Sequence, residues 1–202
     1  FEMNKIAEYI NSAWYTYSTG NESALPPFIG ETTANYTGPV PPFNWLSDQP
    51  KYSWTKLPRY DNKAMQVGPN ARMMVAYAED DAQVKPLVEG GLKQLGLPLS
   101  ALNSTMGRTA ARAMEAVYCS KRYQAVFAGC VDTIKAGQTA TFNPALWEPA
   151  SWPKEAQGVG FVEAPRGTLS HWVRIKDGKI ENYQAIVPTT WNSSDQDPMG
   201  VP

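Results

Sequence analysis

"HWVRIKDGKIENYQ", residues 171–184, decides how the C-terminal third of the chain folds. Two runs of strand-forming residues flank Asp177-Gly178, a dipeptide that strongly predicts a two-residue β-hairpin turn. With this dipeptide in the turn, Arg174 faces Glu181, and an isoleucine pair and an aromatic pair lie on either side of them. Such apolar, opposite-charge and aromatic pairs stabilise antiparallel sheets, so they support this register.

Continued outward, the same register brings two segments together at the far end of the ribbon. His171 falls opposite Gln184, and Arg166 falls opposite Thr189. A permanent cation beside a hydroxyl suits a small anion or a strongly polar ligand. Ordinary structural roles stay open as alternatives. Arg166 would then bond to backbone carbonyls or a carboxylate at a strand end, and His171 to a neighbour such as Gln184.

Two prolines shape this predicted site. Pro165 and Pro188 each lack an N–H donor, so they end regular pairing and splay the two strands apart. Gly167 permits a sharp exit after Arg166. We therefore expect "APRG" and "VPTT" to be two loop ends that one rigid hairpin holds side by side.

The first 50 residues are expected to form an irregular N-terminal segment. A short helix is predicted over residues 3–17, and residues 18–50 are rich in Gly, Pro, Asn and Thr. The Phe, Trp and Tyr content of residues 18–50 is too high for simple disorder. We expect this stretch to lie against a surface, either its own or a partner's.

Residues 51–135 are predicted to hold a strand pair followed by helices. Two short strands flank a turn at Asp61-Asn62. Gly68-Pro69 begins one helix, a second covers residues 82–95, and the longest runs from about Ser100 to Lys135. An apolar stripe on the longest helix is typical of a helix-bundle core, and it comprises Leu102, Met106, Ala110, Met114 and Val117.

The length of 202 residues fits one domain or a large piece of one, in which residues 136–202 form the hairpin region. The expected fold class is α+β, mostly helical, with long bundle helices and small antiparallel hairpins. A formal net charge of −1 argues against a dedicated nucleic-acid-binding protein. No apolar run is long enough to span a bilayer.

The two cysteines predict neither a zinc site nor a disulfide. Two cysteines and one histidine are too few for an ordinary zinc site. Cys119 and Cys130 would lie roughly 16 Å apart along the predicted long helix, too far to bridge each other. We expect both to be buried free thiols.

Two long segments resemble the large subunit of nickel-iron hydrogenases, most closely the uptake or respiratory class. "GVGFVEAPRGTLSHWVRIKDGKIENYQAIVPTTWN", residues 158–192, is similar to the C-terminal part of that subunit. "YSWTKLPRYDNKAMQVGPNARMMVAYA", residues 52–78, is similar to the segment that precedes it. The resemblance implies a middle-to-C-terminal fragment of the large-subunit fold. For the complete enzyme it implies reversible oxidation of dihydrogen to protons and electrons.

The resemblance also assigns roles to the predicted site. In this family a nickel-iron centre carries CN and CO ligands on its iron. The resemblance implies that Arg166 and Thr189 donate hydrogen bonds to the cyanide nitrogens, and that Pro165 and Pro188 shape the apolar wall around the diatomic ligands. Arg166 would also help to polarise dihydrogen, which makes it the expected catalytic residue of this chain.

Further groups are implied around that centre. The backbone carbonyl of Ala185 would bind a magnesium ion, and His171 and Gln184 would support the residues around the metals. Electrons would leave through iron-sulfur clusters in a small subunit. The remaining large-subunit segments would complete the protein, which would be periplasmic or attached to a membrane through its partner subunits.

The chain departs from the family's pattern at its metal ligands. It lacks both Cys-x-x-Cys motifs, and Cys119 and Cys130 have the wrong spacing to replace them. The four metal-binding cysteines would therefore lie outside this chain, which we expect to be inactive alone. Two other functions stay open. One is a non-catalytic interaction or assembly module with residues 18–50 as its partner surface, and the other is a binder of small oxyanions anchored by Arg166.

Overall fold

The computed structural model describes residues 2–20, 23–42 and 50–202. They form two compact units: a sheet unit, Phe1–Val67 with Pro153–Pro202, and a helical unit, Gly68–Trp152. This division differs from the expected single partial domain with internal boundaries near residues 50 and 135. The reason is that N-terminal strands pack with the C-terminal sheet. Helices hold 37% of the described residues and strands 24%, so the fold is α+β but not mostly helical.

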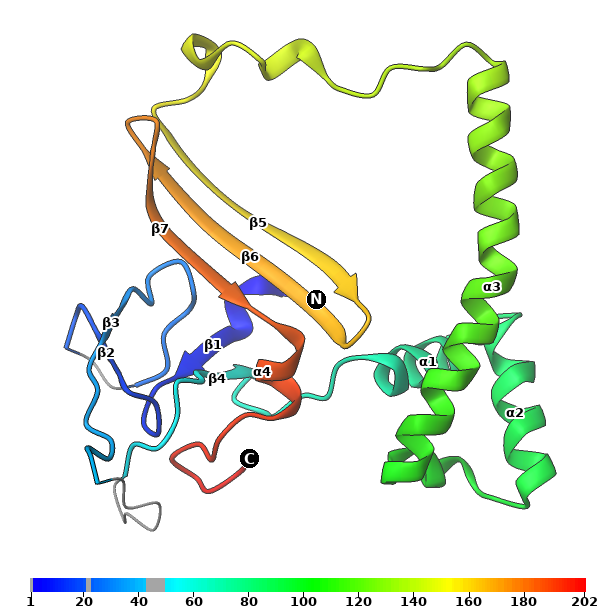
Figure 1. Cartoon of the computed structure of the whole chain (residues 1–202), viewed down its shortest axis with the longest axis horizontal. Coiled ribbons are helices and arrows are strands. Elements are labelled where there is room, and N and C mark those ends of the chain that lie inside the picture. Colours follow the sequence, from blue (N-terminus) through cyan, green and yellow to red (C-terminus); the bar gives the residue numbers. More distant parts are fainter. Residues whose placement is uncertain (1, 21–22, 43–49) are drawn as a thin grey trace. The chain divides into compact units, whose positions relative to one another are not determined.

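A three-stranded antiparallel sheet forms the largest part of the sheet unit (Figure 1). Its order is β5 (Glu155–Ala164), β6 (Gly167–Lys176) and β7 (Lys179–Ile186). Asp177 and Gly178 form the β6–β7 turn with φ of 50° and 71°, the positive values that a type I′ turn needs. The predicted hairpin is confirmed. Sequence reasoning missed β5, because its glycines obscure the alternation of a strand.

The register of β6 and β7 follows the prediction only near the turn. Ile175 pairs with Ile180 as expected. A β-bulge then places Glu181 as an additional residue on β7, so that Arg174 pairs with Asn182. Every pair farther from the turn is shifted by one residue, and the predicted register is wrong there.

The predicted pairing of Arg166 with Thr189 across this ladder is also wrong. The β6–β7 ladder ends before it reaches either residue. Arg166 lies in the turn between β5 and β6, and Thr189 belongs to helix α4 (Pro188–Asn192). Pro188 begins α4, where its missing N–H would have no helical partner. The expectation that Pro188 ends regular pairing is therefore confirmed.

The N-terminal part of the sheet unit is built from short strands. Turn η1 (Met3–Lys5) leads into β1 (Ile6–Tyr9), which pairs antiparallel with β4 (Leu57–Tyr60). A second pair joins β2 (Tyr15–Tyr17) to β3 (Thr32–Ala34). The helix predicted over residues 3–17 is wrong, because burial alternates along β1 with the period of a strand.

The strand pair predicted around Asp61-Asn62 forms only in part. β4 precedes this turn, but after it only an isolated bridge joins Tyr60 and Lys63. β4 pairs with β1 instead. The core of the sheet unit lies beside these strands, where Ile6, Trp172 and Ile186 are almost fully buried.

The helical unit contains α1 (Pro69–Ala78), α2 (Val84–Leu95) and α3 (Thr105–Lys135). Short 3-10 turns η2 (Leu99–Asn103), η3 (Pro144–Leu146) and η4 (Pro149–Ser151) complete it. Gly96 ends α2 with φ of 64°, directly after residue 95, where the sequence predicts the end of this helix. Within the described ranges, no helix is long and apolar enough to cross a membrane.

The apolar stripe predicted along the longest helix is buried only near its start. Leu102 is 1% exposed and lies in η2, because α3 begins three residues later. Met114 packs against the core, whereas Met106 and Val117 are 76% and 43% exposed. Cys119 and Cys130 are free and exposed, so their predicted burial is wrong for this chain.

Candidate functional site

The β5–β6 turn presents Arg166 at the end of the sheet. Ala164 pairs with Gly167, so Pro165 and Arg166 are the two turn residues between them. Gly167 has φ of 135°, a conformation that side chains with a Cβ rarely adopt. Pro165 and Arg166 are both exposed. In the described part of the chain, no side chain forms a hydrogen bond or ion pair with the Arg166 guanidinium.

Helix α4 lies against this turn. The Nδ2 of Asn192 donates a hydrogen bond to the Arg166 carbonyl oxygen over 3.2 Å. Thr189 is exposed on the same helix, and Pro188 is buried beneath it. The structure therefore brings the two predicted segments together through α4, rather than through the strand ladder that the sequence suggested.

His171 and Gln184 lie on opposite faces of the sheet. His171 pairs with Ala185, whereas Gln184 pairs with Trp172, and paired residues share a face. The Nδ1 of His171 is hydrogen-bonded to the Tyr183 hydroxyl. The expected contact between His171 and Gln184 is therefore wrong, because the bulge moved Gln184 to the core face.

A buried charged pair next to Gln184 was not anticipated. Lys56 Nζ lies 2.5 Å from Glu8 Oε2 and donates to Gln184 Oε1 over 2.9 Å. Glu8 is 1% exposed, and its Oε1 has no hydrogen-bond partner in the described structure. Burial raises the pKa of the Glu8 carboxyl above its usual value, and the attraction of Lys56 opposes this shift.

The Glu8 site was missed because residues 3–17 were read as a helix. Ile6, Glu8 and Ile10 in "IAEYI", residues 6–10, share one face at the period of a strand, but the spacing of Ile6 and Ile10 also fits one face of a helix, so this pattern alone does not reveal β1. An acidic residue on the inward face of a strand is unusual, because burying a carboxylate is costly unless it is paired. Such a residue at this position would have marked a polar site.

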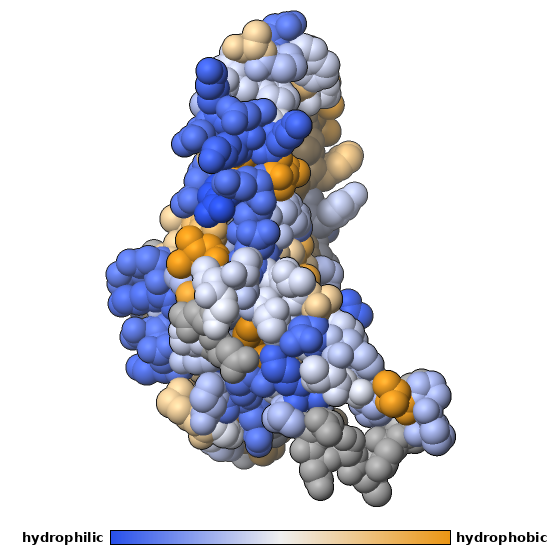
Figure 2. All heavy atoms as spheres, turned by 90° about the vertical axis from the view of Figure 1, so that its left-hand side faces the viewer, coloured by the Kyte–Doolittle hydropathy of each residue, from blue (hydrophilic) through white to orange (hydrophobic). Residues whose placement is uncertain are grey.

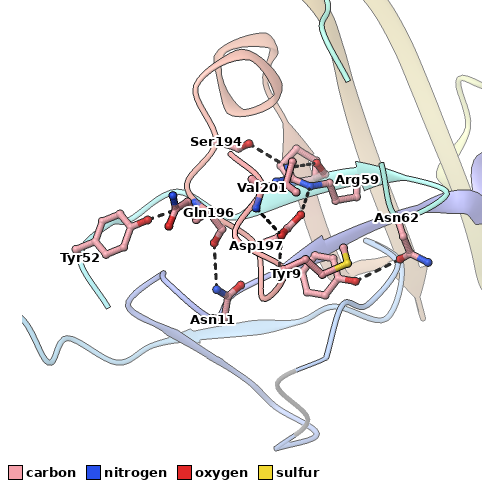
Figure 3. A network of polar contacts seen from close by, with 11 residues as sticks. Tyr9, Asn11, Tyr52, Arg59, Asn62, Ser194, Gln196, Asp197 and Val201 are labelled. Carbon is pink, nitrogen blue, oxygen red and sulfur yellow. Dashed lines mark hydrogen bonds and ion pairs between the residues drawn. The ribbon is translucent and has the colours of Figure 1, made fainter. Parts of the chain in front are cut away.

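The segment after α4 is held by a second buried cation (Figure 3). Arg59 Nη2 donates to the Val201 carbonyl over 2.7 Å, and Nη1 donates to Ser194 Oγ over 3.0 Å. Its Nε pairs with Asp197. Asn11 Nδ2 donates to the Gln196 carbonyl, which ties the same segment to the residues after β1.

A largely apolar pocket of about 290 Å³ lies in the sheet unit beside α4. Trp191 of α4, Phe161 of β5 and Thr168 of β6 line it, together with Val67. On the face drawn in Figure 2, hydrophobic atoms form separate spots among hydrophilic ones. Because α4, β5 and β6 all contribute residues to its wall, the pocket shows that α4 lies next to the two strands that the Arg166 turn connects.

The chain's own residues do not fit the ligand set of a nickel-iron centre. In the parts of the chain that the structure describes, no group of three or more His, Cys, Asp or Glu could hold a metal. Both cysteines are exposed on α3. Glu8 differs, because a buried carboxylate oxygen without a partner is the kind of hard oxygen ligand that magnesium prefers.

Comparisons with known proteins agree along the whole chain. The model of the "Nickel-dependent hydrogenase" family matches residues 1–202. The chain is 47% identical to the uptake hydrogenase large subunit of Bradyrhizobium diazoefficiens and 43% identical to the hydrogenase-1 large chain of Escherichia coli K12. Each match covers 98% of this chain and 34% of the relative, so the chain spans about a third of their length.

Solved structures agree with the sequence comparison. The Ni-Fe-Se hydrogenase from D. vulgaris Hildenborough superposes with a TM-score of 0.72 at 32% identity. That match covers 100% of this chain and 38% of the other. The chain therefore belongs to the nickel-dependent hydrogenase family, and its relatives there are large subunits.

Proposed function

We propose that this chain is the part of a nickel-iron hydrogenase large subunit that covers the metal centre, in a complete enzyme that oxidises dihydrogen reversibly. The family match over the whole chain supports this assignment. The observation that carries it is the Arg166 turn, which α4 holds in place through its backbone while the guanidinium stays unbonded within the described structure. A cation held in this way is available to a ligand from outside the chain.

Arg166 acts in this proposal as a fixed hydrogen-bond donor. A nickel-iron centre held by cysteines outside this chain would supply the redox chemistry that cleaves dihydrogen. The guanidinium of Arg166 and the hydroxyl of Thr189 would donate hydrogen bonds to the cyanide ligands of iron, and Pro165 and Pro188 would keep the surroundings apolar. A planar fork with several N–H donors suits this role better than the single ammonium of lysine.

Magnesium is the second metal that the family implies. We assign its carbonyl ligand to Ala185, which follows Gln184 on β7. The buried Glu8 carboxylate, linked through Lys56 to the neighbouring residue Gln184, is the acidic group that we assign to the same site. An unpartnered oxygen on Glu8 fits a site that gains a cation or an ordered water when the subunit is complete. His171 lies on the other face and supports the sheet through Tyr183.

The far part of α3 supports further large-subunit segments as partners. Six apolar residues there fall within an arc of roughly 100° and form what we call the distal stripe. They are Cys119, Tyr123, Val126, Phe127, Cys130 and Ile134, all exposed. A stripe of this kind is usually covered by another element. We infer that the rest of the large subunit covers it, and that an iron-sulfur small subunit in the periplasm or at a membrane accepts the electrons.

The distal stripe also favours a second candidate function, a non-catalytic assembly module. The two candidate functions differ in the metal content that they predict for the complete subunit. Metal analysis of the complete subunit decides between them: nickel and iron together support the enzyme, and their absence supports the module.

Arg166→Lys in the complete enzyme tests the catalytic role. We expect metal content to stay intact and dihydrogen turnover to fall at least tenfold, which corresponds to about 1.4 kcal/mol of barrier. Arg174→Lys is the matched control, because Arg174 lies on the same sheet but is paired with Glu181. Full turnover in Arg166→Lys with both metals present would remove Arg166 from the mechanism.

A further inference from the structure

The side-chain amide of Asn192 is bonded at both of its ends. Its Nδ2 donates to the Arg166 carbonyl over 3.2 Å, and its Oδ1 accepts from the Val67 backbone N–H over 2.9 Å. The two partners lie 26 and 125 residues away in the sequence. Asn192 therefore joins α4 to the β5–β6 turn and to the end of the segment that follows β4.

The bond to Arg166 acts where the sheet gives little support. The β5–β6 ladder closes at Ala164 and Gly167, so the Arg166 carbonyl lies outside it, in the exposed turn. Helix α4 is itself well anchored, because Pro188 is buried and Trp191 packs against the core of the sheet unit. Asn192 can therefore transmit the position of α4 to the turn.

We propose that Asn192 is a positioning residue for Arg166, and that its amide sets where the Arg166 turn sits relative to α4. That the turn serves a metal centre rests on the proposed function. The hydrogen bond between Asn192 and the turn is independent of the proposed function. Thr189 is on the same helix, so one bond fixes the spacing between the two segments that carry Arg166 and Thr189.

An amide is the group that can make both contacts. Asparagine offers a donor and an acceptor on one carbon, whereas an ionised aspartate only accepts. Asn192→Asp keeps the oxygen that accepts from Val67. It also turns a second oxygen toward the Arg166 carbonyl, so that an attraction becomes a repulsion. Asn192→Ala removes both contacts. The two variants therefore separate the bond to the turn from the bond to Val67.

Trypsin cleavage of the full chain at Arg166–Gly167 measures the freedom of the turn. We expect Asn192→Asp to raise cleavage there about fivefold relative to cleavage at the arginines of α3, the factor that a net hydrogen bond represents. Hydrogen exchange of the Val67 amide should stay slow in Asn192→Asp and become fast in Asn192→Ala. Asn143→Asp makes the same chemical change at a residue that caps η3 and should alter neither readout.

Each outcome decides the proposal. Unchanged cleavage after Arg166 in Asn192→Asp would overturn it. Equal loss of protection at Val67 and at the turn in Asn192→Asp would overturn it too, because that pattern means that α4 unravels as a whole. These readouts need no metal. A result in which Arg166→Lys retains full turnover would reject the proposed function and leave the role of Asn192 standing.

Discussion

Arg59 and Asp197 form an ion pair in which both side chains are 1% exposed, with Arg59 Nε 3.0 Å from Asp197 Oδ2. The pair joins β4 to the segment after α4. Asp197 also accepts from the N–H groups of Met199 and Val201, so that one carboxylate organises the local backbone. A buried pair of this kind is satisfied only when both partners are present.

Removal of one partner should therefore destabilise the sheet unit strongly. We expect Arg59→Met to lower the free energy of unfolding by about 3 kcal/mol or more, because it leaves the Asp197 carboxylate buried without its cation. Urea denaturation followed by tryptophan fluorescence measures the change. Asp80→Asn breaks the exposed pair with Lys85 and should cost no more than about 0.5 kcal/mol. Similar losses in both variants would contradict the assignment of Arg59 as an anchor.

The same pair predicts how stability depends on pH. Burial opposes ionisation of Asp197, but the N–H of Val201 and the Arg59 guanidinium outweigh it and lower the pKa of the carboxyl. A lowered folded-state pKa gives stability that is present above the unfolded value of about 3.9 and is lost as pH falls toward the folded value.

Asp197→Asn tests this dependence on pH. The free-energy difference between the native chain and Asp197→Asn should be largest at neutral pH and shrink below about pH 4. Denaturation curves at a series of pH values measure it. A difference that stays constant down to pH 2 would show that Asp197 contributes through its shape rather than its charge.

The sequence predicted local features well where a turn or a cap determines the backbone. The β6–β7 turn forms at Asp177-Gly178, α2 ends at Gly96, and β-pairing stops at Pro188. Each of these features depends on the φ angle or the missing N–H of the residue itself. The sequence did not predict the bulge at Glu181. A bulge is selected by the packing of Trp172 and Asn182 against distant residues, and the pattern of the strand itself does not reveal such packing.

The polar parts of the site were harder to predict for the same reason. Arg166 was identified in the sequence, but Asn192 holds it through a contact that spans 26 residues. Glu8 and Lys56 are separated by 48 residues and meet only because β1 pairs with β4. Reading residues 3–17 as a helix removed that pairing, and the charged pair was lost with it.

Gly167 provides a prediction about the turn itself. Its φ of 135° is unfavourable for any residue with a Cβ, so Gly167→Ala should destabilise the sheet unit by about 1–3 kcal/mol. Gly158→Ala is the control, because a Cβ there meets nothing within 4 Å and no positive φ is required. Alanine should be neutral or stabilise that strand by up to about 1 kcal/mol. Thermal unfolding of both variants checks the difference in sign.

The two cysteines test whether the distal stripe is covered in the complete subunit. Cys119 and Cys130 are both exposed in this chain and face the same side of α3. In the 202-residue chain both thiols should react with a small disulfide reagent at the rate of a free thiol. In the complete large subunit, packing of another segment on the stripe should slow both reactions at least tenfold.

Denaturant provides the control for this last experiment. Both thiols of the complete subunit should regain full reactivity in urea, which shows that burial and not oxidation protects them. Tyr123→Lys places a charge between the two cysteines on the stripe and should restore their reactivity without urea, because the covering segment would have to bury that charge. Fast labelling of both cysteines in the native complete subunit would show that its remaining segments do not cover α3.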